Sequence, residues 1–194
     1  MRGNRLVRQA WVAAAVVAGV VGAAGRGTPL VADAGTAVQA PSLQAALAAD
    51  VAQMGEKFVG LARVLDGKYD WRPGQGVRSV GEVLNLIVAE NGMLNAAVTP
   101  TPAPATAGRG GRPAPITAAV PMQQALRTSS AALQKTIAGL SDADLNTPAQ
   151  IFGQQTTKRG AIMMVLGDQH EHLGQSIAYA RMNGIAPPWS RPTN

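Results

Sequence analysis

The chain contains no cysteine among its 194 residues. Structural disulfides, thiolate zinc sites and a cysteine nucleophile are therefore excluded. Aromatic residues make up only 4 % of the chain, too few for a β-sandwich or a β-barrel, whose strands favour β-branched and aromatic side chains. Charged residues amount to 14 %, and the formal net charge of +6 includes three arginines among the first eight residues. Because the remaining positive charge is small and scattered, we expect no nucleic-acid partner.

Residues 1–34 have the pattern of a signal peptide followed by a flexible leader. The three early arginines precede an apolar run of mainly Ala and Val at positions 10–24, and small residues offer cleavage after Ala24 or after Ala34. The alternative is an inner-membrane anchor formed by residues 10–24, although a bilayer span normally needs about 20 apolar residues. We expect an exported protein, periplasmic or secreted, that meets the membrane only transiently through this leader.

Residues 42–190 have the hydrophobic periodicity of four amphipathic helices. From Ser42 to about Leu65, apolar side chains recur every three or four positions, which places them on one face of a helix. Three more helices are expected from Ser79 to about Val98, from near Pro121 to Gly139, and from about Thr157 to Asn183. No segment shows the alternation typical of strands. The prediction is an all-α fold, a four-helix bundle.

Local signals mark the helix ends and the loops between them. Ser79 and Glu82 have the spacing of a capping box at the start of the second helix. A segment rich in Pro, Ala, Thr and Gly at residues 99–120 predicts a long loop within the domain. After the third helix, Ser141 can cap a short helical turn, and a polar loop is expected from there through Gln155.

The two histidines, His170 and His172, are candidates for chemistry. Two positions correspond to about 200° of helix rotation, so the two rings cannot bind one ion. Asp168, His172 and Gln175 instead share one helix face, and Asp168 with His172 could provide two ligands for a divalent cation. The alternative is a polar seam in which Asp168 accepts a hydrogen bond from His172.

The second predicted helix carries two glutamates on one face. Glu82 and Glu90 lie eight positions apart, with Leu86 between them and Asn91 beside Glu90. Carboxylates that point into a bundle can build a metal site or an acid–base site, whereas carboxylates that point outward are solvated. Trp71, in the preceding loop, either closes one end of the core or lines the mouth of a ligand pocket.

Two segments resemble the DinB-like superfamily. The first is YDWRP at residues 69–73 with VRSVGEVL at 77–84, and the second is HLGQSIAYARMNGI at 172–185 with the prolines at 187–188. This superfamily consists of four-helix bundles that include damage-inducible proteins and thiol-dependent S-transferases. The resemblance covers roughly residues 43–190 and implies the same fold.

The resemblance also implies a position for a metal site. Metal-binding members hold a divalent ion with three histidines, one from the second helix and two from the last helix. These positions correspond here to Leu86, Asp168 and His172. His172 matches, Asp168 can still act as a ligand, and Leu86 cannot. The family's three-histidine site is therefore incomplete, and a third ligand would have to come from Glu90 or Glu82.

Two functions of different classes follow. The first is an exported DinB-like domain without a cofactor, which binds a small molecule or an envelope partner. The second is a transferase or hydrolase that depends on a divalent metal (nickel, zinc or manganese) bound by His172 and Asp168. The family's thiol transferases act in the cytoplasm, so export would separate this chain from their cosubstrate. An envelope contact through residues 99–120 and a homodimer through an exposed apolar helix face remain further alternatives. The candidate pocket residues are Leu86, Asn91, Gln175 and Trp71.

Overall fold

Four long helices occupy the regions that the periodicity predicts. The computed structural model describes residues 40–99 and 114–190. Its long helices are α1 (Leu43–Val64), α2 (Val80–Val98), α3 (Ala119–Ala138) and α5 (Lys158–Met182). The predicted leader at residues 1–34, with its two cleavage sites, and most of the predicted loop at 99–120 lie outside the described residues. Within residues 40–99 and 114–190, no helix combines the length and the apolar character needed to cross a membrane.

Side-chain caps determine where three of the long helices begin. The Ser42 hydroxyl accepts a hydrogen bond from the backbone of α1, and Thr157 does the same for α5. The capping box of α2 is complete: Ser79 Oγ accepts from the Glu82 backbone at 3.2 Å, and the Glu82 carboxylate accepts from the Ser79 backbone at 2.6 Å. Helix α3 has no such cap and begins at Ala119, slightly before the expected proline.

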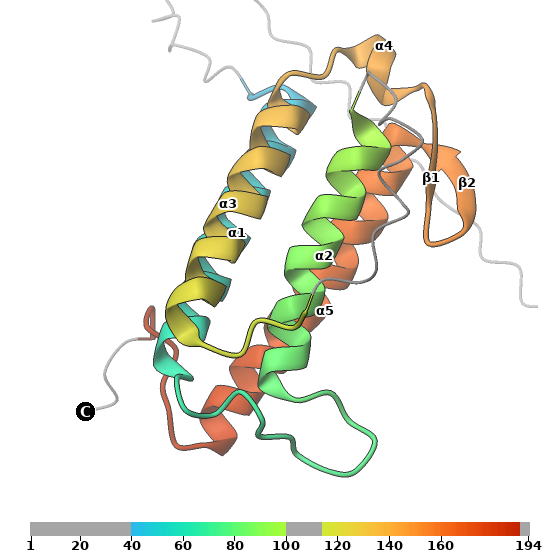
Figure 1. The fold of residues 1–194 in the computed structure, drawn as a ribbon. Coiled ribbons are helices and arrows are strands. Elements are labelled where there is room, and N and C mark those ends of the chain that lie inside the picture. The colour runs from blue at the N-terminus through green and yellow to red at the C-terminus, as the bar shows by residue number, and fades with distance from the viewer. Residues whose placement is uncertain (1–39, 100–113, 191–194) are drawn as a thin grey trace, which may run out of the picture. The chain divides into compact units, whose positions relative to one another are not determined.

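The four helices pack so that α1 and α2 lie diagonally across the bundle. Each of them packs against both α3 and α5 (Figure 1). Asn91 of α2 donates to Ser129 and Ser130 of α3, and further along the same helices Thr136 donates to Asn95. Since residue numbers rise together along both helices, α2 and α3 run parallel. The connection between them must therefore return the chain to the other end of the bundle.

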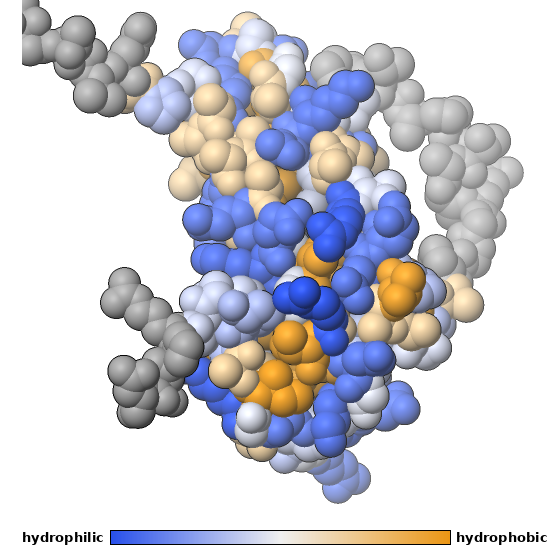
Figure 2. Space-filling model, turned by 90° about the vertical axis from the view of Figure 1, so that its left-hand side faces the viewer, coloured by the Kyte–Doolittle hydropathy of each residue, from blue (hydrophilic) through white to orange (hydrophobic). Residues whose placement is uncertain are grey.

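Apolar side chains from all four helices form one core. Fully buried members include Phe58, Met54, Leu61, Leu84, Ile87, Leu94, Met122, Leu126, Leu133 and Ile137. At Gly55 the helices come close, because a Cβ atom there would lie 2.7 Å from Ser130 Oγ. Figure 2 shows the side of the domain on which α1 and α3 lie, where several hydrophobic patches are separated by hydrophilic residues. A homodimer through an exposed apolar helix face stays a prediction.

The predicted polar loop through Gln155 is wrong. A short helix, α4 (Asp142–Leu145), is followed by a two-stranded antiparallel hairpin of β1 (Pro148–Ile151) and β2 (Gln154–Thr157). Phe152 and Gly153 at its turn both have positive φ, which suits the tight turns of hairpins. Only β1 alternates, over four residues with two buried side chains. So short an alternation is hard to recognise in a sequence.

Candidate metal centre

Three potential ligands converge where α2 packs against α5. Glu90 comes from α2, and Asp168 and His172 lie one turn apart on α5. Each offers one ligand atom, and the three atoms all lie within 4.8 Å of one another. Glu90 lies near the middle of α2, and Asp168 and His172 lie near the middle of α5. The cluster therefore lies midway along the bundle rather than at one of its ends (Figure 1).

Glu90 is a buried carboxyl group that lacks a complete set of partners. Its side chain is only 2 % exposed, and its Oε2 atom has no hydrogen-bond partner among the described residues. Burial, together with the hydrogen bond and like charge of Asp168, raises the pKa of Glu90 to about 8, while Gln169 and Arg78 act in the opposite direction. A buried oxygen of this kind is costly unless a proton or a cation satisfies it.

His172 and Asp168 form the more accessible side of the cluster. Their side chains are 14 % and 38 % exposed, and His172 Nε2 lies 3.6 Å from Asp168 Oδ2. This separation is too long for a hydrogen bond. His172 instead pairs through Nδ1 with Gln175 Oε1 at 2.9 Å. The hydrogen bond of the predicted polar seam, with Asp168 accepting from His172, is therefore not formed, although Nε2 and the Asp168 carboxylate lie within ion-pair distance.

A buried polar layer supports the cluster from inside the bundle. Asn91 Oδ1 accepts from Gln169 Nε2 at 3.0 Å, and the Asn91 amide nitrogen donates to Ser129 and Ser130 of α3. Asn91 and Gln169 are each adjacent in sequence to a member of the cluster. These hydrogen bonds therefore link α2, α3 and α5 at the level of the three ligands and limit how far the ligands can move apart.

The other predicted candidates lie elsewhere. Glu82 caps α2 and lies 3.4 Å from Arg72, and the hydrogen bond from the Ser79 backbone is the main cause that lowers its pKa. Of the two glutamates, only Glu90 is in the cluster. Trp71 packs edge-on against Tyr179, with ring centroids 5.4 Å apart. His170 Nε2 lies 2.9 Å from Asp50 of α1, so the two histidines face different neighbours, as the helix rotation predicts.

Leu86 does not fill the cluster. It is half-buried and lines a cavity of about 910 Å³ beside α2. Other lining residues come from the loop before α2, from α2 itself and from the segment at 114–117, and they include Arg72, Arg78, Asn85, Ala89 and Ile116. Asn85 fastens that segment through hydrogen bonds to both backbone groups of Ile116. The cavity combines apolar walls with two arginines and two acidic residues, Asp70 and Glu82, and Glu82 pairs with Arg72 at 3.4 Å. Such a mixed lining suits a small molecule with polar groups.

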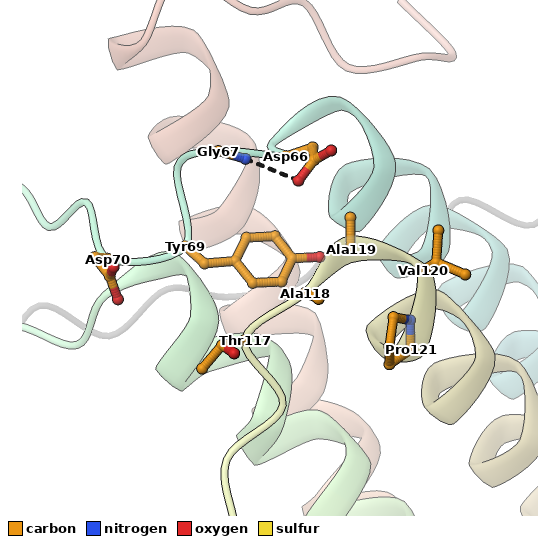
Figure 3. A pocket seen from close by; sticks show the side chains of 9 residues that line it. All are labelled: Asp66, Gly67, Tyr69, Asp70, Thr117, Ala118, Ala119, Val120 and Pro121. Atoms are coloured by element: carbon orange, nitrogen blue, oxygen red, sulfur yellow. Dashed lines mark hydrogen bonds between the residues drawn. The ribbon is translucent and has the colours of Figure 1, made fainter.

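A second, smaller hollow lies at the end of the bundle where α1 ends and α3 begins. Its volume is about 440 Å³, and Figure 3 shows Tyr69 extending across it, with Asp66 and Asp70 at its edge. The Tyr69 hydroxyl donates to the Ala62 carbonyl at 3.0 Å, and burial raises its pKa to about 12. A phenol with so high a pKa stays protonated at neutral pH.

The chemistry of the donor set fits a divalent cation. Two carboxylates and one imidazole are ligands that zinc and manganese accept, and three protein ligands leave coordination positions for water or substrate. A divalent ion would balance the two carboxylate charges and would give the Glu90 oxygen the partner it lacks. The site residues that sequence reasoning missed are Gln169 and Tyr179. A polar residue within the apolar stripe of the last helix was the available signal for Gln169.

Comparison with known proteins agrees with this architecture. A family model described as the DinB superfamily matches residues 51–176. The fold is similar to that of a DinB-like protein from Bacillus subtilis (TM-score 0.60, 14 % identity, 76 % of this chain and 99 % of that chain covered). It is also similar to that of a DinB-like protein from Bacillus cereus (TM-score 0.56, 19 % identity, 71 % and 91 % covered). No curated protein matches the sequence. The family match spans well over half of the chain, which therefore belongs to the DinB superfamily.

Proposed function

We propose that this protein is a divalent-metal-dependent hydrolase or transferase whose metal ligands are Glu90, Asp168 and His172. The observation that carries the proposal is the buried, unpartnered Glu90 oxygen within 4.8 Å of ligand atoms from Asp168 and His172. Zinc and manganese are the favoured ions, and nickel is the weaker candidate because two of the three ligands are hard oxygen donors.

The remaining residues divide into positioning and substrate-binding groups. A bound divalent ion would supply Lewis acidity and an activated water or substrate atom. Asn91 and Gln169 hold α2 and α5 at the separation that the ligands require. The cavity beside Leu86 would receive the substrate, because Leu86 lies one helical turn before Glu90 on α2. Arg78 in its wall would attract an anionic group.

Metal binding by the purified domain tests the proposal directly. Metal content and melting temperature are measured with zinc, manganese and nickel, since a ligand that binds only the native state raises its stability. Hydrolysis of a p-nitrophenyl ester and of a p-nitrophenyl phosphate, with and without a chelator, then tests catalysis. We expect one equivalent of metal, an increase in melting temperature, and metal-dependent turnover of at least one substrate.

The chain offers a matched pair of histidine variants for this experiment. His172→Ala should abolish metal uptake, whereas His170→Ala, which removes an imidazole that faces Asp50 on the outside of the bundle, should leave it unchanged. If millimolar metal neither binds nor stabilises the wild-type domain, the proposal is wrong. The metal-independent function then remains, with the 910 Å³ cavity as the site for a small molecule.

Export is the second part of the proposal. The arginines and the apolar run of residues 1–34 support it. Full-length protein expressed in a bacterial host should appear outside the cytoplasm with a new N-terminus at Gly25 or Gly35. A protein that keeps Met1 and fractionates with the membrane would instead support the anchor at residues 10–24.

A further inference from the structure

A chain of hydrogen bonds leads from the backbone at the start of α2 to His172. The Tyr179 hydroxyl donates to the Arg78 carbonyl at 3.1 Å. Gln175 Nε2 donates to the Tyr179 oxygen at 2.8 Å. At the far end, Gln175 Oε1 lies 2.9 Å from His172 Nδ1. Tyr179 thus contacts both neighbours through its hydroxyl group, whereas Gln175 uses its amide nitrogen for one neighbour and its amide oxygen for the other.

Elementary hydrogen-bond chemistry allows only one order of donors and acceptors along this chain of hydrogen bonds. A backbone carbonyl can only accept, so the single hydroxyl proton of Tyr179 is committed to Arg78. The Tyr179 oxygen must then accept from Gln175, which requires the amide nitrogen to face the tyrosine. The amide oxygen of Gln175 therefore faces His172, and it too can only accept. It follows that His172 Nδ1 carries a hydrogen.

This assignment determines the chemistry of the opposite ring nitrogen. A neutral imidazole has one N–H, so His172 Nε2 carries a lone pair. Nε2 lies 3.6 Å from Asp168 Oδ2, and His172 offers one ring nitrogen to the cluster that includes Glu90. His172 Nε2 and the Asp168 carboxylate thus lie together as electron-pair donors, and the Glu90 carboxyl becomes a third donor when it releases its proton. A cation satisfies all three at once.

Packing makes this chain of hydrogen bonds rigid enough to impose the Nδ1–H tautomer on His172. The Tyr179 ring is buried, and it packs edge-on against Trp71. Arg78 immediately precedes Ser79, whose capping box holds the first turn of α2 in place. The accepting carbonyl therefore lies directly before a helix start that a complete capping box holds in place.

We propose that Tyr179 and Gln175 are positioning residues that hold His172 as its Nδ1–H tautomer and so present Nε2 to a divalent cation. The role of the cation rests on the proposed function. The tautomer itself can be tested without metal. Metal-bound histidines commonly donate their other N–H to a protein acceptor, and loss of such a partner typically weakens metal binding about 10–100-fold.

The first test reads the tautomer in the metal-free protein. Long-range ¹H–¹⁵N spectra distinguish protonated from unprotonated ring nitrogens, and they are recorded at about pH 8.5, above the usual range of imidazole titration. The chain has only two histidines, so the His170→Gln variant assigns the signals. We expect Nδ1–H for His172 in the wild-type protein and a mixture of tautomers in Tyr179→Phe, because Gln175 can then turn around.

The second test measures the dissociation constant for zinc and manganese. Tyr179→Phe should weaken binding about ten-fold or more. Tyr69→Phe is the matched control: it also removes a buried hydroxyl that donates to a backbone carbonyl, but it has no connection to His172. This control should change neither the tautomer nor the dissociation constant, so a general loss of stability would not mimic the expected result.

A rescue variant completes the design. Adding Gln175→Glu to Tyr179→Phe replaces the amide by a carboxylate that can only accept, so the Nδ1–H tautomer should return. An Nε2–H tautomer in the wild-type protein, or an unchanged tautomer in Tyr179→Phe, would overturn the inference. A wild-type protein with the expected tautomer that binds no cation would overturn the proposed function and leave the positioning of His172 supported.

Discussion

Replacing Glu90 by glutamine should have opposite effects on the metal-free and the metal-bound protein. Glutamine keeps the shape of the side chain and removes the ionisable carboxyl group. Without metal, the wild-type domain must either protonate Glu90 or bury its charge, and the variant does neither. With metal, the wild-type domain gains stability that a glutamine ligand cannot provide. A single substitution therefore separates the destabilisation caused by the buried carboxyl group from the stabilisation gained on metal binding.

The pKa of Glu90 gives the size of the effect. Its value rises from 4.5 to about 8 in the folded protein, and one pH unit corresponds to about 1.4 kcal/mol. The full cost of the charged form is therefore at most roughly 5 kcal/mol. Relaxation and water entry reduce such penalties in real proteins, so we expect the variant to be about 2–4 kcal/mol more stable at pH 9.

The pH dependence follows from the direction of the shift. The unfolded chain releases the Glu90 proton near its ordinary pKa, whereas the folded chain keeps it until about pH 8. The stability associated with this group is therefore fully present below about pH 4.5 and is lost as the pH rises through 8. The difference between Glu90→Gln and the wild-type protein should be small at pH 5, should increase between about pH 5 and pH 8, and should level off above pH 8.

Urea unfolding in the presence of a chelator measures this difference at each pH. Comparison with the wild-type protein removes the contributions of other groups, such as Asp144 and Glu82, whose pKa values are lowered mainly by hydrogen bonds at helix starts. Glu171→Gln, an exposed glutamate on α5, is the matched control and should show no such trend. With saturating metal at about 100 times the dissociation constant, the wild-type domain should gain about 2.7 kcal/mol, and Glu90→Gln should gain little.

A difference between Glu90→Gln and the wild-type protein that stays constant from pH 5 to pH 9 would refute this reasoning. So would a variant that is less stable than the wild-type protein at pH 9 without metal. Either result would mean that the Glu90 carboxylate is already well satisfied in the folded domain.

Four further substitutions test the packing of the bundle and the cap of α2, all by chemical or thermal unfolding. Gly55→Ala should destabilise the domain by about 1–3 kcal/mol, because its Cβ would meet a serine of α3 at 2.7 Å. Gly92→Ala, whose Cβ meets nothing within 4 Å, should stabilise the domain by about 0.5–1 kcal/mol. Equal effects of the two substitutions would contradict the close approach of α1 and α3 at Gly55. Asn91→Ala should cost about 1–3 kcal/mol, because it leaves Gln169 buried without its acceptor, and a smaller loss would mean that water replaces the amide. Ser79→Ala should cost about 1 kcal/mol through loss of the capping box of α2, and an unchanged midpoint would show that the cap is dispensable.

The helices could be predicted from the sequence because their signals are local. Ser42, Ser79 and Thr157 begin helices, and apolar spacing identifies the buried faces. The hairpin at 148–157 could not be predicted in the same way, because only four residues of β1 alternate and the strand depends on packing against α2 and α5. The family resemblance correctly indicated the four-helix bundle. Its two motifs lie at the start of α2 and in the C-terminal half of α5.

For the candidate site, sequence reasoning identified Asp168 and His172 as neighbours one helical turn apart, and helix rotation correctly separated His170 from them. It did not decide whether Glu82 or Glu90 is the third ligand. Glu82 and Glu90 share a face by spacing, yet one caps its helix and the other enters the bundle. That distinction depends on where α5 crosses α2, which no local pattern encodes.

The sequence by itself determined the helix boundaries, the caps and the superfamily, because each depends on residues close together in the chain. Only the tertiary structure decided that Glu90 joins Asp168 and His172, that Leu86 lines a cavity, and that Arg78, Tyr179 and Gln175 connect to His172. The contacts of Glu90 with α5 and of Tyr179 with Arg78 join residues about 80 to 100 positions apart, and their geometry is fixed by how the four helices pack.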